Sequence, residues 1–246
     1  MPATTFLETD QGRTLAYHLT QGRGPCIVFL GGLKSDMEGT KAVHLEAWAR
    51  AQGRAFLRFD YSGHGESSGR FTDGCIGDWA QDSLAAVTAL TTGPLVLVGS
   101  SMGGWQSLLL ARAIPERIAG LVTIAAAPDF TEDGYWAGFS DAQKAALDSV
   151  GHVELPSDYM EPYIITKRMI EDGRDQLVLR APLALPFPVR FLQGTQDTAV
   201  STQTALRLLD HATSPDMRLT LVKDADHRFS DDRCLDLIVA AINEVL

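Results

Sequence analysis

The chain has 246 residues, a length that one α/β domain can fill, so the sequence predicts a single domain over residues 1–246. Hydrophobic residues make up 45% of the chain and charged residues 21%, which is enough apolar material for a full core. The formal net charge of −10 disfavours binding to the phosphate backbone of nucleic acids. No stretch approaches the roughly 20 apolar residues of a membrane-spanning helix.

The cysteines and the N-terminal residues give indications of the cellular compartment in which the protein is located. Cys26, Cys75 and Cys234 are far apart and lack CxxC spacing, which argues against a disulfide framework and fits a reducing environment. The first residues have neither the basic and apolar segments of a secretory signal nor the arginine richness of a transit peptide. We therefore expect a cytoplasmic protein. The expected surface helices carry no heptad pattern that would indicate an oligomeric state.

Apolar runs alternate along the chain with longer segments of helical periodicity. Strands are predicted at residues 4–8 and 14–19, and at Pro25–Leu30, Arg54–Phe59, Leu95–Gly99, Ile118–Ala125, Val189–Gln193 and Arg218–Val222. Helices are predicted at Thr40–Gln52, Ile76–Leu90, Met102–Ile114, Thr202–Leu209 and Asp231–Val245. This alternation is typical of an α/β fold with a mainly parallel, doubly wound sheet that has helices on both faces.

The segment from about Pro128 to Pro188 breaks the alternation and is too long for a simple loop. Ser140 followed by Gln143 fits a capping box and predicts a helix over residues 141–149. A second helix is predicted over Pro162–Asp172. We expect this segment, about 128–188, to be an inserted helical lid.

Aromatic side chains are frequent in the insertion, and two interpretations of them stay open. They pack the inserted helices against the sheet, or they line an apolar substrate cleft. Both interpretations can hold for different residues. The candidates for the cleft are Trp136, Tyr159 and Tyr163.

The pattern G-x-S-x-G occurs at Gly99, Ser101 and Gly103. The pattern alone is common, but here it directly follows an apolar strand and directly precedes a helix, which is the setting of the nucleophile elbow in α/β-hydrolases. That turn holds its serine in a strained conformation, so that Oγ projects from the carboxyl edge of the sheet. A Gly/Ser turn without chemistry is the alternative, and Ser100 is out of register with the glycines. The sequence predicts Ser101 as the nucleophile.

A serine hydroxyl needs a general base, which a histidine oriented by a carboxylate supplies. In α/β-hydrolases the order along the chain is serine, acid, histidine. His227 lies in the loop between the last predicted strand and the last helix, where this order requires the base. The other five histidines precede the nucleophile or lie in loops or at a helix end: His18, His44, His64, His152 and His211.

The acid is expected at the end of the first strand after the insertion, because the active-site loops of an open sheet gather at the carboxyl ends of its strands. Asp197 occupies that position. Asp129, which ends the preceding strand, is the main alternative. Asp224 and Asp226 are further alternatives, but a carboxylate so near the histidine in sequence rarely reaches the correct ring nitrogen. The sequence therefore favours Asp197.

An oxyanion hole needs two backbone N–H donors. Met102, immediately after the nucleophile, is expected to supply one, and Leu33, in the loop after the Pro25–Leu30 strand, the other. Many relatives of this fold have His-Gly where this chain has Gly31-Gly32. Because the donor is a backbone group, the difference leaves the mechanism intact. A further carboxylate in a sharp loop, Asp60, is expected to cap its turn.

Five stretches carry a resemblance to a known family: Gly32–Ala42, Arg58–Gly63, Gly99–Trp105, Leu155–Tyr159 and Asp226–Arg228. They are similar to the abhydrolase-domain-containing protein 10 family, and the first stretch is the family-specific one. The resemblance extends from about Cys26 to the C-terminus. It implies an α/β-hydrolase fold in which Ser101, Asp197 and His227 form the catalytic triad.

Animal members of that family look like mitochondrial acyl-protein thioesterases that also hydrolyse acyl glucuronides. The resemblance thus implies a serine hydrolase (EC 3.1) that cleaves ester or thioester bonds. The expected substrate is a small molecule or an acylated protein with an apolar acyl group. The lack of a transit peptide departs from the animal members and suggests a bacterial-type relative.

Alternatives to this function stay open. A carboxylesterase or monoacylglycerol-type lipase would use the same residues on small esters, whereas a non-catalytic protein of this fold would use the cleft for ligand binding. A cofactor-free haloperoxidase or C–C hydrolase is less supported. No metal-ligand spacing and no Walker-type or GxGxxG loop occurs, so we expect neither a metal nor a cofactor.

Overall fold

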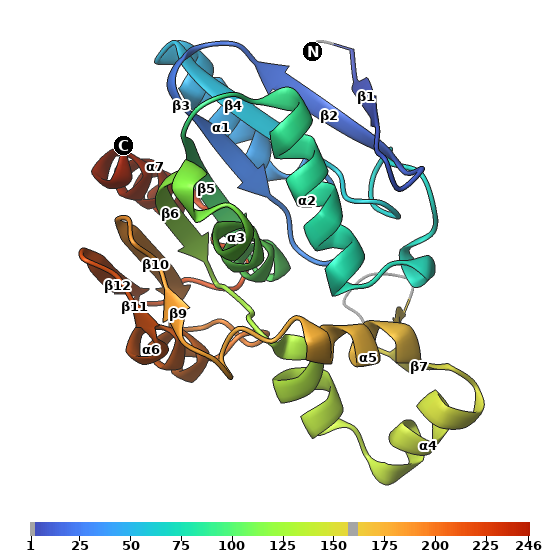
Figure 1. Cartoon of the computed structure of the whole chain (residues 1–246). Helices are drawn as coiled ribbons and strands as arrows, with labels where there is room; N and C mark the ends of the chain where they lie inside the picture. Colours follow the sequence, from blue (N-terminus) through green and yellow to red (C-terminus); the bar gives the residue numbers. More distant parts are fainter. Residues whose placement is uncertain (1–2, 157–161) are drawn as a thin grey trace.

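An eight-stranded sheet forms the centre of the computed structural model, which describes residues 3–156 and 162–246 (Figure 1). The strand order is β1-β2-β4-β3-β5-β6-β10-β12. From β4 to β12 neighbouring strands run parallel, while β1 and β2 join antiparallel at one edge. The bounds are β1 Thr5–Glu8, β2 Thr14–Thr20, β3 Arg23–Leu30, β4 Arg54–Phe59, β5 Leu95–Ser100, β6 Ile118–Ile124, β10 Val189–Gly194 and β12 Met217–Val222.

Helices cover both faces of this sheet, because the side chains of each buried strand point alternately to either side. In β3, Val28 and Leu30 join the core under α2, α3 and α6, whereas Ile27 and Phe29 join the core under α1 and α7. These helices are α1 Thr40–Ala51, α2 Ile76–Leu90, α3 Met102–Ala113, α6 Thr202–His211 and α7 Asp232–Val245. The predicted mainly parallel, doubly wound α/β sheet is confirmed.

The insertion, residues 128–188, leaves the sheet between β6 and β10 and lies below it in Figure 1. Its α4 matches the predicted helix, and the predicted capping box between Ser140 and Gln143 is present. Its elements are a π-helical turn η3 Thr131–Trp136, α4 Asp141–Ser149, β7 His152–Leu155, β8 Tyr163–Thr166, α5 Lys167–Asp175 and β9 Leu183–Ala184, which pairs with β11 Ala212–Thr213. Two short 3₁₀ turns, η1 Phe71–Asp73 and η2 Pro115–Arg117, complete the described elements.

The helix predicted over Pro162–Asp172 is wrong in its first part. Residues 163–166 instead form β8, which pairs antiparallel with β7, because an aromatic and β-branched run favours an extended backbone. The helix α5 begins only after Thr166, whose Oγ1 accepts the N–H of Met169 at 3.1 Å as an N-cap. Among the described residues, no helix is both long enough and apolar enough to cross a membrane.

Arg58, on β4, is buried among polar partners that tie the sheet to α1. Its Nε donates to Glu46 Oε2 at 2.8 Å, and its Nη1 donates to the Met37 carbonyl at 2.8 Å and to Glu38 at 2.5 Å. Burial alone would raise the pKa of Glu46, but hydrogen bonds from Thr20 and Arg58 outweigh it and hold this pKa below its usual 4.5. The ionised Glu46 therefore stabilises the fold.

We expect Glu46→Ala to lower the free energy of unfolding by about 3 kcal/mol, because it leaves the buried guanidinium with one carboxylate fewer. Chemical denaturation at pH 7 measures this loss. Since the folded pKa of Glu46 lies below 4.5, its contribution is complete above that pH and fades as the pH falls through the folded value. Glu171→Ala, which removes an exposed partner 3.7 Å from Lys167, is the control and should cost less than about 1 kcal/mol. A wild-type advantage over Glu46→Ala that grows as the pH falls would contradict this account.

Candidate active site

Ser101 lies in the turn between β5 and α3, with φ +56° and ψ −117°. A non-glycine residue in this region of backbone space is strained and is held there by its surroundings. Its N–H donates to the Ile124 carbonyl at 2.9 Å, and its carbonyl accepts the N–H of Ala127 at 3.1 Å. Both contacts come from β6 and the residues after it, so the neighbouring strand fixes the turn.

Two glycines allow the strand and the helix to approach at this turn. A Cβ on Gly99 would lie 2.2 Å from the Gly103 carbonyl oxygen, and a Cβ on Gly103 would lie 2.0 Å from the Leu30 carbonyl oxygen. Both distances are far below van der Waals contact. The G-x-S-x-G pattern therefore follows from sterics: a side chain at Gly99 would push α3 away from β5, and one at Gly103 would push α3 away from the end of β3.

A chain of hydrogen bonds links the three residues proposed as a triad from the sequence. His227 Nε2 lies 3.1 Å from Ser101 Oγ, and His227 Nδ1 lies 2.8 Å from Asp197 Oδ2. Ser101 follows the carboxyl end of β5, Asp197 that of β10 and His227 that of β12. These ends meet at one edge of the sheet because the strands are parallel. An ionised carboxylate only accepts hydrogen bonds, so Nδ1 carries the proton and Nε2 can accept the serine hydroxyl.

The side chain of Asp197 is fully buried, and both of its carboxylate oxygens accept two hydrogen bonds. Oδ1 accepts the N–H groups of Ala199 and Val200 at 2.9 and 2.8 Å, and Oδ2 accepts Gln193 Nε2 at 3.0 Å besides His227. Burial alone would raise the pKa of Asp197, but the hydrogen bonds from His227, Val200 and Gln193 outweigh it and lower this pKa. The aspartate thus stays ionised beside the imidazole.

Asp129, the main alternative acid, is engaged elsewhere. Its buried carboxylate accepts the N–H groups of Val178 and Leu179 at 2.8 and 3.0 Å and pairs with Arg180 at 3.2 Å. Burial raises the pKa of Asp129 despite these bonds. It anchors the returning end of the insertion and makes no hydrogen bond to His227.

The other carboxylates considered from the sequence also have local partners. Asp224 accepts Gln196 Nε2 at 3.2 Å, and Asp226 accepts the N–H of Phe229 at 3.1 Å. Asp60 accepts the N–H groups of Met37 and Glu66 at 2.6 and 2.9 Å, in the turn-capping role predicted for it. Each of these three carboxylates organises a loop.

A cavity of about 370 Å³ opens over Ser101 and His227. Its apolar wall comes from the sheet loops and the insertion: Leu33, Met102, Phe130, Tyr135, Tyr163 and Val200. Its polar side includes Ser35, Lys41 and Arg228. A cavity of this kind suits an apolar group placed beside the serine hydroxyl.

The two residues expected to donate backbone N–H groups both line this cavity. Met102 begins α3, so its N–H is among those without an intrahelical partner. Leu33 follows Gly32, where an added Cβ would lie only 3.4 Å from Ser101 Cβ. The loop after β3 therefore runs directly beside the serine.

Of the three residues of the insertion predicted to line the cleft, one lies in the cavity wall. Tyr163 lines the cavity. Trp136 is not among the residues that line this cavity: the Lys144 ammonium lies 5.2 Å and the Arg174 guanidinium 4.6 Å from its ring centroid. Both cations come from the insertion's own helices, α4 and α5, and lie within the distance at which a cation is attracted to an indole face. Tyr159 lies outside the described residues.

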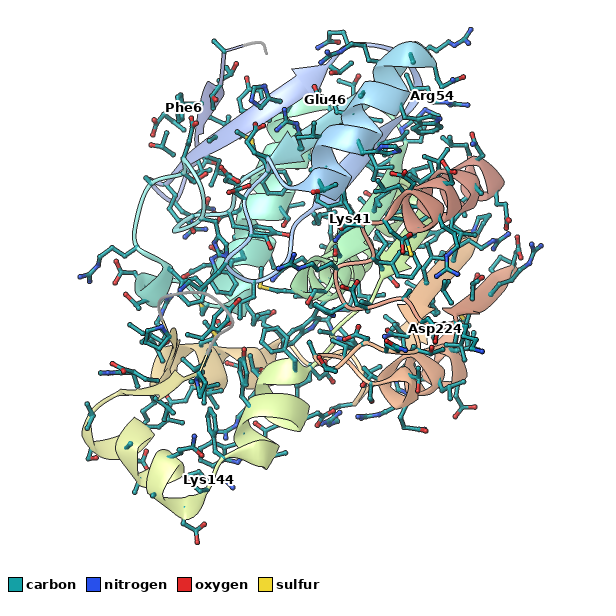
Figure 2. The ribbon with its side chains drawn as sticks, turned by 180° about the vertical axis from the view of Figure 1, so that it is seen from behind. Phe6, Lys41, Glu46, Arg54, Lys144 and Asp224 are labelled. Atoms are coloured by element: carbon teal, nitrogen blue, oxygen red, sulfur yellow. The ribbon has the colours of Figure 1, made fainter. Side chains whose placement is uncertain are left out.

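Lys41 and Arg228 were not predicted from the sequence as cavity residues. Figure 2 labels Lys41 at the end of α1 that faces the middle of the molecule. Its Nζ donates to the Arg228 carbonyl at 2.5 Å, which ties α1 to the loop that carries His227. Burial lowers the pKa of Lys41 to about 8. The only signal in the sequence was its position inside the Gly32–Ala42 stretch.

Within residues 3–156 and 162–246, no group of three or more His, Cys, Asp or Glu side chains is arranged to hold a metal ion. A serine hydroxyl hydrogen-bonded to an imidazole is an arrangement that permits proton transfer and nucleophilic attack. Ser101 supplies a hydroxyl and His227 a base, and both face the cavity.

The family model for the alpha/beta hydrolase fold matches residues 27–154, more than half of the chain. The mouse palmitoyl-protein thioesterase ABHD10, mitochondrial, is 36% identical over 244 residues, which cover 98% of this chain and 82% of the relative. The human protein of the same name is 33% identical over 98% of this chain and 79% of its own length. Their names place these relatives in mitochondria and do not support the cytoplasmic location, which stays a prediction.

Solved structures agree with these matches. A hydrolase from Agrobacterium vitis S4 superposes with a TM-score of 0.94 at 37% identity, covering 99% of this chain and 98% of that one. The alpha/beta hydrolase domain-containing protein 10 from mouse superposes with a TM-score of 0.91 at 33% identity over 99% of this chain and 98% of that one. The chain therefore belongs to the α/β-hydrolase family and, within it, to the hydrolases related to ABHD10, as the sequence resemblance implied.

Proposed function

We propose that the protein is a serine hydrolase that cleaves acyl thioester or ester bonds, with Ser101 as nucleophile, His227 as general base and Asp197 as the orienting acid. The observation that carries this proposal is the hydrogen-bonded chain from Ser101 Oγ through His227 to Asp197, at 3.1 and 2.8 Å. The strained turn at Ser101 supports it, because that turn aims the hydroxyl into the cavity.

In the first step, Ser101 Oγ attacks the acyl carbonyl carbon while His227 Nε2 takes the hydroxyl proton. Asp197 stabilises the imidazolium without becoming protonated. The tetrahedral intermediate then collapses: the bond to the leaving sulfur or oxygen breaks, and His227 returns its proton to that atom. The acyl group stays on Ser101 as an ester.

In the second step, His227 takes a proton from a water molecule that attacks the acyl-enzyme. Collapse of this second intermediate breaks the bond to Ser101, restores its hydroxyl and releases a carboxylic acid. In both steps the backbone N–H groups of Met102 and Leu33 would hold the developing oxyanion. Their place in the cavity wall beside Ser101 supports this role.

Two observations favour an apolar acyl group. The relatives at 33–36% identity are named palmitoyl-protein thioesterases. The cavity wall in this chain is built mainly from apolar and aromatic side chains, among them Leu33, Phe130 and Tyr163. In this proposal the whole chain is one domain, and the insertion is a lid over the acyl group.

A fluorophosphonate probe tests the nucleophile, because it bonds to the activated serine of a serine hydrolase. We expect stoichiometric labelling of the wild type, and mass mapping should place the label on Ser101. Ser101→Ala should lose labelling and at least about 10³-fold in kcat. The neighbouring Ser100→Ala is the matched control and should still be labelled. Labelling that persists in Ser101→Ala would refute the assignment.

Exchanging the two candidate acids tests the role of Asp197. Asp197→Asn should lower kcat by about 10⁴-fold, because the amide favours the wrong tautomer of His227. Asp129→Asn should retain kcat within a few-fold, since the Asp129 carboxylate accepts hydrogen bonds from the returning end of the insertion and none from His227. Steady-state kinetics together with a melting curve separates activity from stability. Near-normal turnover in Asp197→Asn combined with loss in Asp129→Asn would reassign the acid.

A substrate panel tests the bond and the acyl group. We expect kcat/KM to rise with acyl length from two carbons toward long chains, since each buried CH₂ contributes about 0.8 kcal/mol to binding. Thioesters and oxygen esters of the same acyl group should be compared side by side. A clear preference for acetyl oxygen esters would favour the carboxylesterase alternative. Absence of hydrolysis throughout the panel would favour a ligand-binding role.

A further inference from the structure

The loop after β3 makes a tight turn in which Lys34 has an unusual conformation. The N–H of Ser35 donates to the Gly32 carbonyl at 3.1 Å, which closes a four-residue turn over Gly32–Ser35. Lys34, its third residue, has φ +56°, where glycine or asparagine is favoured. A lysine in this conformation persists only if its surroundings hold it there. The turn also contains Leu33, the proposed oxyanion donor.

The Lys34 side chain reaches two aromatic rings from different parts of the fold. Its Nζ lies 5.5 Å from the centroid of the Phe71 ring and 5.1 Å from that of the Tyr163 ring. Both distances fall within the roughly 6 Å at which an ammonium ion is attracted to a ring face. Phe71 belongs to η1 beside the sheet, whereas Tyr163 begins β8 of the insertion and lines the cavity. One ammonium group therefore connects the turn to both.

On the Phe71 side, this contact is part of an aromatic cluster. The Phe71 ring stacks on Trp79 at 5.8 Å, and His64 meets both rings edge-on at 5.5 and 5.1 Å. Burial lowers the pKa of His64, and the charge of Lys34 acts in the same direction, so this imidazole is neutral at pH 7. The ammonium thus faces aromatic surface without a competing cation from His64.

We propose that Lys34 is a positioning residue, whose contact with Phe71 and Tyr163 fixes the Gly32–Ser35 turn and thereby aims the Leu33 N–H at the oxyanion. The inference rests on the proposed function, because the oxyanion forms only in an acyl transfer. Lys34 does not line the cavity, so it acts through Leu33 rather than on the substrate. An acyl group packed against Tyr163 would reinforce the same contact from the substrate side.

Lys34→Met tests this role, because methionine keeps the length of the side chain and loses the charge. We expect kcat to fall roughly tenfold with KM changed less than about twofold, since a displaced donor weakens the transition state more than substrate binding. A boronic acid that mimics the tetrahedral intermediate should lose affinity by the same factor. Lys34→Arg should restore most of kcat, because a guanidinium also binds aromatic faces.

Phe71→Leu removes one of the two rings without altering the cavity wall. Its effect on kcat should not add to that of Lys34→Met in the double variant, because both changes break the same contact. Lys144→Met is the matched control: its Nζ lies 5.2 Å from the Trp136 ring, and neither residue lines the cavity. Figure 2 places Lys144 at the far end of the insertion from Lys41. This variant should keep wild-type kcat.

The failure of this inference can be told from the failure of the proposed function. If the fluorophosphonate does not label Ser101 in the wild type, the proposed function fails. If labelling is normal but Lys34→Met keeps both kcat and boronic acid affinity, the role of Lys34 alone is overturned. The same conclusion follows if Lys34→Met loses melting temperature together with activity and Lys34→Arg restores neither.

Discussion

The close approach of α3 to β5 is the constraint on which the candidate site depends. Gly99 leaves no room for a side chain between β5 and α3, and Gly103 leaves none between α3 and the end of β3. Ser101, in the tight turn between these glycines, has a positive φ at the carboxyl edge of the sheet. Asp197 and His227 reach the same edge because β10 and β12 run parallel to β5. A hydroxyl and an imidazole 126 residues apart in sequence are thereby brought within hydrogen-bond distance.

The cavity wall has two parts, one from the sheet and one from the insertion. Leu33, in the loop after β3, and Met102, at the start of α3, lie at the sheet edge, while Phe130, Tyr135 and Tyr163 come from the insertion. The first group is fixed by the turns that it belongs to, and the second can differ between relatives without disturbing the sheet. The bond that is cleaved would thus depend on the sheet, and the acyl group that is accepted on the insertion.

Most of the fold and the positions of three site residues could be predicted from local patterns. Apolar runs buried on both faces identify parallel strands, and the ends of those strands, together with the serine–acid–histidine order of α/β-hydrolases, point to Ser101, Asp197 and His227. Asp129 could not be excluded by sequence, because its partners, the N–H groups of Val178 and Leu179, lie about 50 residues further along the chain. The strand β8 was predicted as helix, because its extended form depends on pairing with β7, a contact that local sequence patterns do not contain.

The contacts of three further side chains could not be predicted from the sequence. Lys34, Lys41 and Trp136 take their roles from what lies opposite them in space, respectively two aromatic rings, the Arg228 carbonyl and two cations. The most direct test of the central claim is to mix the wild type with a long-chain acyl thioester, quench with acid within the first turnovers, and map the acylated peptide by mass spectrometry. The account predicts the acyl group on Ser101. An acyl group on another residue, or undiminished hydrolysis by Ser101→Ala, would contradict it.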